Sequence, residues 1–508
     1  MMQKKSILAV LFVVLLTALT VNGAVADEEV FTSGDYQYRI LEDGTAEITR
    51  YSGEDEALKI PETLDGKTVT SIGNEAFSLN ISLTSIELPD GVTSMGANPF
   101  KGCMLLKNIR VSTEQPVFAV IDGVLFNKAE KSLICYPARK QADAYRVPQG
   151  IQQIGDYALY CSSLTSIELP DSVTSIGGRA FGGCNSLTSI ELPDSVTSMG
   201  ANPFVGCELL KSILVSSEQP AFAAIDGVLF NKAEKSLICY PAGKQADAYK
   251  VPQGIQRIGD SAFMCCSSLT SIELPDSVTS IGDSAFWRCE SLTSIELPDS
   301  VTSIGDSAFW QCESLTNIEL PDGLTSIRDY AFSRCRSLAS IELPNGVTSI
   351  GNKAFWSCVS LTSIELPDSV TSIGDCAFSS CSSLTNIELP DSVTNIGDSA
   401  FDGCFSLTSV ELPDGLTSIG DSAFWQCESL TNIELPDGLT SIRDYAFSGC
   451  FSLTSVELPE SVTSVGIDVF KHCDSLTLTV PHDSYAAQYA KDNGLNYTYP
   501  DANDWLNN

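Results

Sequence analysis

The feature that most constrains the fold of this chain is a repeat of 23 residues. One unit, Cys289 to Gln311, reads CESLTSIELPDSVTSIGDSAFWQ. The same spacing separates the prolines Pro275, Pro298, Pro321, Pro344, Pro367, Pro390, Pro413, Pro436 and Pro459. A unit this short cannot bury its own apolar side chains, whereas stacked copies bury a continuous core. The repeat therefore predicts a solenoid of in-register coils.

The spacing within one unit predicts its local structure. Ile295 and Leu297 alternate with Glu296, which is typical of a short strand with one buried face. Pro298 ends that strand, and residues 306–309, DSAF, are expected to form a capped single helical turn. The predicted class is an α/β repeat solenoid with coils of about 23 residues, parallel strands and short helical turns. The expected core positions are Leu292, Ile295, Leu297, Val301, Ile304, Phe309 and Cys312.

Longer duplications are visible as well. Residues 98–156 return as 202–260, and Cys312–Cys335 returns almost unchanged as Cys427–Cys450. The first pair carries two inserts near 112–146 and 216–250, each containing GVLFNKAEKSLICYP. We expect these inserts to be hairpin-like loops that project from the solenoid.

The ends of the chain depart from the repeat. Residues 1–26 resemble a signal peptide, with Lys4 and Lys5 before an apolar run and Ala24-Val25-Ala26 at its end. Residues 27–60 are expected to be an N-terminal cap with a β-hairpin turning at Asp43-Gly44. The solenoid then spans 61–480, and residues 481–508 form a C-terminal cap and tail that begins with a short helix. A secreted or extracellular location follows, without a membrane span in the mature chain.

Composition excludes several function classes. The 508 residues carry a net charge of −35, which disfavours nucleic acid as a partner because phosphates need clustered Lys and Arg. The two histidines, His472 and His482, lie near the C-terminus, so histidine-based catalysis is not expected along most of the chain. We predict that the protein is not an enzyme.

A column of glutamates is the most distinctive chemical feature. The position between the two strand residues carries Glu in twelve units, Glu87, Glu168, Glu191, Glu273, Glu296, Glu319, Glu342, Glu365, Glu388, Glu411, Glu434 and Glu457. Stacked carboxylates about 4.8 Å apart repel one another. The row from Glu273 to Glu457 could bind Ca²⁺ or a basic partner, or simply be a solvated face that keeps the protein soluble. A catalytic carboxylate pair is not expected, because every rung offers the same environment.

Tryptophan and cysteine also recur at fixed places in the unit. The position two residues before the repeat cysteine holds Trp287, Trp310, Trp356 and Trp425. These side chains are candidates for a binding surface, or they lie flat over the next coil as packing. The cysteines at the repeat position are expected to be free, buried thiols rather than disulfides, because in-register side chains point the same way.

The unit L-x-x-I-x-L-P-x-x-V-x-x-I-x-x-x-A-F-x-x-C, with Asp43-Gly44-Thr45-Ala46 and Ile60-Pro61, resembles the BspA-like leucine-rich repeat family. The resemblance implies a bacterial surface or secreted protein that binds an extracellular protein or glycan in adhesion, without a catalytic site or cofactor. The alternative is a structural or cation-binding extracellular rod without a specific ligand. We expect a monomer.

Overall fold

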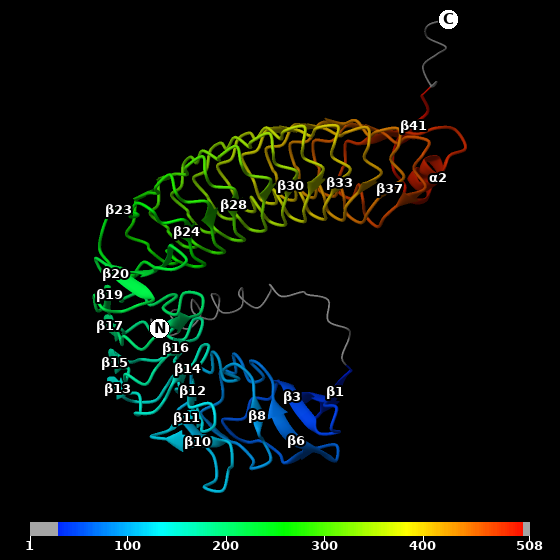
Figure 1. Cartoon of the computed structure of the whole chain (residues 1–508). Helices are drawn as coiled ribbons and strands as arrows, with labels where there is room; N and C mark the ends of the chain where they lie inside the picture. Colours follow the sequence, from blue (N-terminus) through cyan, green and yellow to red (C-terminus); the bar gives the residue numbers. More distant parts are fainter. Residues whose placement is uncertain (1–28, 501–508) are drawn as a thin grey trace, which may run out of the picture. The chain divides into compact units, whose positions relative to one another are not determined.

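The structure is a computed structural model that describes residues 29–500, so the predicted signal peptide lies outside the described residues. The described chain winds into successive coils (Figure 1). Its contacts divide it into two compact units. The first unit runs to Ala233 and includes Cys239–Lys244, and the second comprises Glu234–Ile238 and the chain from Gln245 onwards.

Two columns of short parallel strands run along the second unit. The first column contains the Ile-Glu pair of each repeat, and its strands are β23 (Ala248–Lys250), β25 (Ser271–Glu273), β27 (Ser294–Glu296), β32 (Asn386–Glu388), β34 (Ser409–Glu411), β36 (Asn432–Ile433), β38 (Ser455–Glu457), β40 (Thr477–Thr479) and β41 (Tyr497–Thr498). Paired residues lie one repeat apart, as in Ile272↔Ile295. The predicted register of 23 residues is therefore confirmed.

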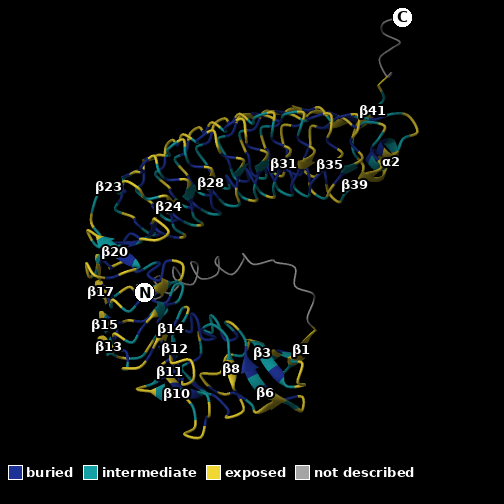
Figure 2. Ribbon diagram, viewed as in Figure 1, coloured by how far each residue is buried: buried dark blue, intermediate teal, exposed yellow. Residues whose placement is uncertain are grey.

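The second column contains the Ser-Ile pair that follows the proline. Its strands are β22 (Ser236–Cys239), β24 (Arg257–Ile258), β26 (Ser280–Ile281), β28 (Ser303–Ile304), β29 (Ser326–Ile327), β30 (Ser349–Ile350), β31 (Ser372–Ile373), β33 (Asn395–Ile396), β35 (Ser418–Ile419), β37 (Ser441–Ile442) and β39 (Ser464–Val465). Pairing is again parallel and in register, for example Ile281↔Ile304. The two columns enclose the core of each coil (Figure 2).

The core is built from identical side chains stacked on one another. Ten phenylalanines from Phe263 to Phe470 stack with ring centroids 5.1–5.7 Å apart. Of the core positions predicted for one coil, Leu292, Ile295, Val301, Ile304, Phe309 and Cys312 are buried. Leu297 is half-buried.

The cysteine column packs beside the phenylalanines. The Cys312 thiol donates a hydrogen bond to the Phe286 carbonyl at 3.2 Å, and Cys381 does the same to Phe355 at 3.2 Å. Burial raises the pKa of the Cys381 thiol to about 12. The column therefore consists of neutral thiols that satisfy carbonyls of the preceding coil, and such thiols are poor nucleophiles.

The segment predicted to be a helical turn is not helical. Ser307 and Gln311 have φ of +58° and +61°, in the left-handed region. The Ser307 N–H donates to the Asp329 carbonyl of the next coil at 2.8 Å, and the Phe309 N–H donates to Ala331 at 2.9 Å. Because alternate N–H groups point along the stack, they cannot form the bonds of an α-helix. Each coil is closed by consecutive turns, so the fold is a β-solenoid with little helix.

An aspartate column links these turns. The Asp306 N–H donates to the Asp283 carboxylate at 2.9 Å, and the Asp421 N–H donates to Asp398 at 2.8 Å. The preceding glycine allows the close approach, since a Cβ at Gly305 would lie 2.5 Å from the Asp283 nitrogen. These carboxylates are structural, because each satisfies a backbone donor that the turn leaves unpaired.

The first unit repeats this architecture with additional strands. Its first column holds β4 (Ala57–Lys59), β7 (Ser85–Glu87), β9 (Asn108–Arg110), β13 (Ala144–Arg146), β15 (Ser166–Glu168), β17 (Ser189–Leu192) and β19 (Ser212–Val215), and its second holds β6 (Lys67–Ile72), β8 (Ser94–Met95), β14 (Gln153–Ile154), β16 (Ser175–Ile176) and β18 (Ser198–Met199). At its start, β1 (Val30–Ser33), β2 (Tyr36–Ile40) and β3 (Ala46–Tyr51) form antiparallel pairs, and β5 (Thr63–Leu64) pairs with β6.

The two inserts form hairpins, but they do not project as free loops. β10 (Phe118–Ile121) pairs with β11 (Val124–Asn127), and β11 with β12 (Ser132–Cys135). β20 (Phe222–Ile225) and β21 (Val228–Asn231) repeat the first pair. Phe118, Leu125 and Leu133 are at most 1% exposed. The expectation of projecting loops is wrong because the apolar side chains of the hairpins belong to the core.

The described chain ends with helix α2 (Tyr485–Asp492) and β41. The Ser484 hydroxyl accepts a hydrogen bond from the Ala487 N–H at 3.0 Å, which makes it the N-cap. Ala486 and Ala490 are buried. Among residues 29–500, no helix is long and apolar enough to cross a membrane.

Candidate binding surface

The glutamate column lies on the outer face of the first strand column. All nine side chains from Glu273 to Glu457 are exposed, because each alternates with a buried Ile or Val. Several pair directly in register along the stack, including Glu273↔Glu296 and Glu388↔Glu411. The predicted row of carboxylates therefore exists as one continuous surface feature of the second unit.

A basic residue begins each run of glutamates, a feature that sequence reasoning missed. Lys59 pairs with Glu87 at 2.9 Å, Arg146 pairs with Glu168 at 2.6 Å, and Lys250 contacts Glu273. Each cation occupies the strand position that glutamate holds in the next coil. The signal could have been found by extending the 23-residue register into the irregular coils. Exposed pairs of this kind contribute less than about 1 kcal/mol each.

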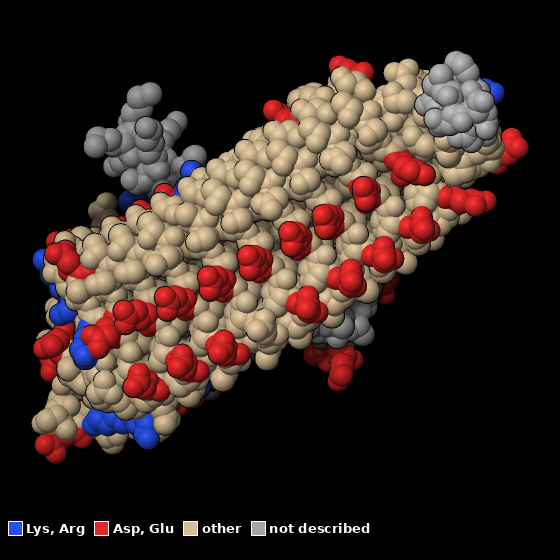
Figure 3. Space-filling view, turned by 90° about the horizontal axis from the view of Figure 1, so that it is seen from above, with Lys and Arg blue, Asp and Glu red and all other residues tan. Residues whose placement is uncertain are grey.

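A second acidic row accompanies the glutamate column. Three residues after each glutamate, the exposed positions are Asp276, Asp299, Asp322, Asp368, Asp391, Asp414, Asp437 and Glu460, interrupted by Asn345. Figure 3 shows the two rows side by side along the repeat. Together with the net charge of −35, these rows generate a negative potential that attracts cations and basic partners.

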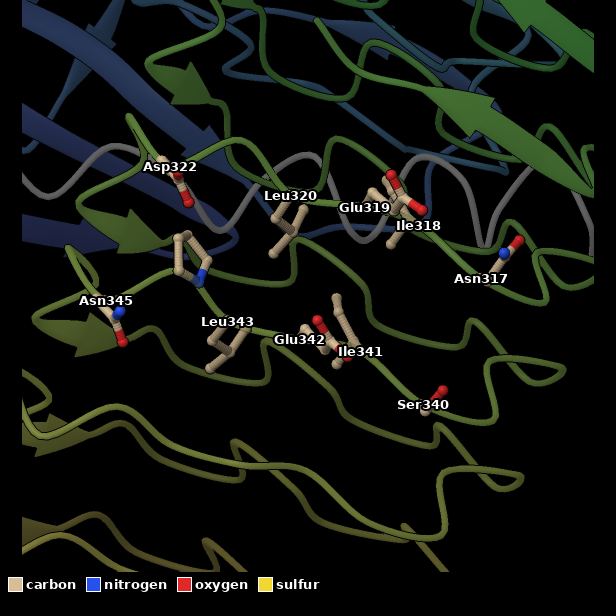
Figure 4. A pocket seen from close by; sticks show the side chains of 11 residues that line it. Asn317, Ile318, Glu319, Leu320, Asp322, Ser340, Ile341, Glu342, Leu343 and Asn345 are labelled. Atoms are coloured by element: carbon tan, nitrogen blue, oxygen red, sulfur yellow. The ribbon is translucent and has the colours of Figure 1, made fainter. Parts of the chain in front are cut away.

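A shallow hollow lies on this face between two coils. It is lined by residues 317–320 and 322 of one coil and 340–345 of the next (Figure 4). Ile318 and Ile341 are buried beneath it, while Glu319 and Glu342 are exposed. Residues 317–320 form no strand in the described structure. The ionisable side chains that line the hollow, Glu319, Asp322 and Glu342, are all carboxylates.

The described residues contain no group of three His, Cys, Asp or Glu side chains placed to hold a metal ion. The glutamates form a line rather than converging on one point. A Ca²⁺ ladder of Glu273, Glu296, Glu319, Glu342, Glu365, Glu388, Glu411, Glu434 and Glu457 therefore remains a proposal.

The four repeat tryptophans do not share one environment. Trp287 and Trp310 are 3% and 4% exposed and stack with ring centroids 5.0 Å apart. Trp356 is half-buried beneath the Arg334 guanidinium, which lies 4.6 Å from its ring centroid. Trp425 is 39% exposed. Of the two alternatives predicted for these tryptophans, Trp287 and Trp310 take packing over the neighbouring coil rather than a place on a binding surface.

Other exposed apolar side chains gather on the coils around Trp425. Phe405, Tyr445, Phe451 and Ile467 are 42%, 40%, 51% and 63% exposed. Phe405 and Phe451 directly follow a repeat cysteine, at a position whose residue type varies between units. Together with Trp425 they form what we call the C-terminal aromatic patch. Isolated exposed apolar residues are common, but a cluster on adjacent coils is typical of an interaction site.

Asp402 borders this patch and carries an unusual carboxyl group. Burial raises its pKa to about 6, and its only side-chain donor in the described structure is the Ser379 hydroxyl at 3.4 Å. At pH 7.5 the fold holds an ionised, half-buried carboxylate, which opposes folding.

We therefore expect Asp402→Asn to raise the melting temperature at pH 7.5. Because the folded pKa lies above the unfolded one, the unfavourable contribution disappears as the pH falls through about 6 towards 4. Thermal unfolding of both proteins at pH 7.5 and pH 4.5 measures the difference. A variant less stable than the wild type at pH 7.5 would contradict this account.

In-register coils of about 23 residues, with parallel strands and little helix, define a leucine-rich repeat β-solenoid. The chain belongs to the BspA-type leucine-rich repeat family. The sequence model of the BspA type leucine rich repeat region matches residues 56–131, 141–235, 242–362 and 348–477, in six copies. Leucine-rich repeats of this type form protein-interaction scaffolds and are generally non-catalytic.

Solved structures of bacterial leucine-rich repeat proteins are similar to this chain. A leucine rich cell surface protein from Faecalibacterium prausnitzii is 32% identical, covers 72% of this chain and 95% of its own, and gives a TM-score of 0.42. A leucine-rich repeat protein from Bacteroides ovatus is 24% identical, with 92% and 99% coverage and a TM-score of 0.41. A protein from Eubacterium ventriosum is 22% identical, with 73% and 93% coverage and a TM-score of 0.45. No curated protein matches the chain.

Proposed function

We propose that this protein is a secreted or surface-associated, non-catalytic binding protein whose coils present an adhesion surface to an extracellular protein or glycan. The observation that carries the proposal is that the core positions of each coil are constant, whereas the exposed residue after the repeat cysteine varies. The residue after the repeat cysteine changes among Glu313, Arg336, Phe405 and Phe451, all exposed, while the adjacent Phe and Cys do not change. Such a scaffold can vary its surface without altering its core.

The proposal also covers the two ends of the chain and its oligomeric state. We propose that residues 1–26 direct export, that residues 27–60 with their hairpin cap the first coil, and that residues 481–508 with helix α2 cap the last coil. Buried Tyr38 and Ile48 at one end, and Ala486 and Ala490 at the other, support capping because they cover apolar surface of a terminal coil. We also propose that the protein is a monomer.

The experiment that tests this function is binding of the purified protein to an immobilised panel of extracellular-matrix proteins and glycans, at physiological salt, with Ca²⁺ and with chelator. The alternative function is a structural, cation-binding rod. It is favoured by the continuous carboxylate column, whose mutual repulsion a bound divalent cation would relieve.

If the column binds Ca²⁺, then millimolar CaCl₂ should raise the melting temperature by a few degrees beyond NaCl of matched ionic strength. A variant with Glu342, Glu365, Glu388 and Glu411 changed to Gln should lose most of this shift. Equal melting temperatures in CaCl₂ and NaCl would contradict specific Ca²⁺ binding by the column.

A further inference from the structure

The C-terminal aromatic patch lies in a segment that the chain contains twice. Residues 302–335 and 417–450 have the same sequence except that Arg334 is replaced by Gly449. Trp310 and Tyr330 of the first copy therefore correspond to Trp425 and Tyr445 of the second. The first pair has ring centroids 5.5 Å apart, and Trp310 is 4% exposed. Since the segments differ only at the position of Arg334 and Gly449, the exposure of Trp425 must come from this replacement and from residues outside the segment.

Beside the first copy, cationic side chains of the chain itself lie over two aromatic rings, those of Trp356 and Tyr330, whereas Trp310 is stacked on Trp287. The Arg334 guanidinium lies 4.6 Å from the Trp356 ring centroid, and the Lys353 amine lies 5.3 Å from that of Tyr330. Arg288, one residue before its repeat cysteine, reaches the Glu290 carboxylate one residue after it, at 3.3 Å. Arg288 and Arg334 both precede a repeat cysteine. From this position a side chain can reach the residue after the same cysteine, as Arg288 does, or the tryptophan of the next coil, as Arg334 does.

In the second copy, these covering groups have been replaced. Glycine replaces two arginines, with Gly403 in place of Arg288 and Gly449 in place of Arg334. Asp468 replaces Lys353, and Asp402 replaces Trp287. Gly403 lies between Phe405 of its own coil and Trp425 of the next, with its N–H donating to the Trp425 carbonyl at 2.8 Å. A Cβ at Gly403 would meet no atom closer than 3.6 Å. The position that Arg288 occupies beside the first copy therefore carries no side chain in the second, and the first atom of a side chain would fit there.

The charges around this space are negative. Asp402 precedes Gly403, Glu428 lies between the coils of Phe405 and Phe451, and Asp468 follows in the next coil. Two cations lie on these coils, and each pairs with a carboxylate of the chain: Lys471 with Asp468 at 2.8 Å, and Arg443 with Asp398 at 3.1 Å. Exposed aromatic rings beside carboxylates are complementary to a guanidinium or ammonium group, which gains from both the ring and the charge.

We propose that the C-terminal aromatic patch binds an arginine or lysine side chain on a basic segment of a partner protein, with the cation over Trp425 in the space beside Gly403. The proposal rests on the function proposed above and names the chemistry of the partner. The partner would provide the contact that Arg334 provides to Trp356 within the chain.

The test uses the full chain and a fluorescein-labelled peptide of alternating Gly and Arg, with fluorescence anisotropy in 150 mM NaCl. The matched neutral peptide carries citrulline in place of each Arg. We expect saturable binding of the arginine peptide and at least about tenfold weaker binding of the citrulline peptide. Because this assay does not use the matrix and glycan panel, it can fail while the general binding function holds.

Two variants locate the site. Trp425→Ala removes the ring, and Gly403→Arg should cover the ring as Arg334 covers Trp356, so each should weaken peptide binding about fivefold to tenfold. Circular dichroism checks that both variants fold. Ser357→Arg is the control for charge, since Ser357 occupies the same position two coils earlier, with φ of +58°. The Glu342→Gln, Glu365→Gln double variant is the control for non-specific attraction.

Both controls should change the affinity less than about twofold. The proposal is overturned if the arginine peptide does not bind, if folded Gly403→Arg binds like the wild type, or if either control weakens binding as much as Gly403→Arg. The last result would show that the peptide responds only to the overall negative charge.

Discussion

Replacing Phe355 by alanine should lower the free energy of unfolding by about 3 to 5 kcal/mol. The Phe355 ring is fully buried and stacks between Phe332 and Phe378, with centroid distances of 5.6 and 5.4 Å. Neighbouring coils are held in register by their strands, so they cannot collapse into the space that the ring leaves. Urea unfolding followed by circular dichroism measures the change.

Phe405→Ala provides a matched control within the same repeat family. Phe405 is 42% exposed and has no place in the phenylalanine stack, so its removal should change stability by less than about 0.5 kcal/mol. If the two variants were equally stable, the stacked rings would not be the core of the solenoid.

Replacing Cys358 by aspartate should destabilise the protein by about 3 kcal/mol or more. The Cys358 thiol is fully buried and donates to the Phe332 carbonyl at 3.1 Å. An ionised carboxylate would face that carbonyl without a donor, whereas a protonated one could still donate. The destabilisation should therefore be larger at pH 8 than at pH 5, as measured by urea unfolding at both values.

Cys376→Asp is the corresponding control. Cys376 lies outside the cysteine column, is half-buried, and has φ of +53°, a conformation that Asp tolerates better than most residues. We expect a loss of about 1 kcal/mol or less. If Cys376→Asp lowered the free energy of unfolding as much as Cys358→Asp, burial in the cysteine column would not be the cause of the destabilisation.

The regular part of the fold could be predicted from sequence because the repeat determines it. Once Ile295 and Leu297 define a strand and Pro298 its end, the 23-residue period places each residue beside its own copy in the next coil. Parallel in-register strands, a buried phenylalanine stack and an outward glutamate column follow from that period alone.

The turn after Gly305 could not be predicted in the same way. The residues 306–309 suit a capped helical turn, but the backbone N–H groups of Ser307 and Phe309 find better partners in the next coil. Local propensity is overridden because stacking offers hydrogen bonds that an isolated unit lacks. The inserts also depart from the projecting loops that were expected, because their hairpins carry apolar residues that the neighbouring coils bury.

The tryptophans show where a repeated sequence stops determining the environment. Trp310 and Trp425 lie in segments that match over more than a coil, yet one is buried and the other is exposed. What differs is the neighbouring coil, where Trp287 and Arg288 are replaced by Asp402 and Gly403. Exposure in a solenoid is therefore a property of adjacent units, and a motif within one unit cannot predict it.

The measurement that tests the central claim most directly is the binding isotherm of the intact, purified protein on the immobilised panel of matrix proteins and glycans, with Ca²⁺ and with chelator. The account predicts saturable binding to one class of ligand that persists at 150 mM NaCl. Absence of binding to every member of the panel in both conditions would contradict a binding function and favour a structural rod.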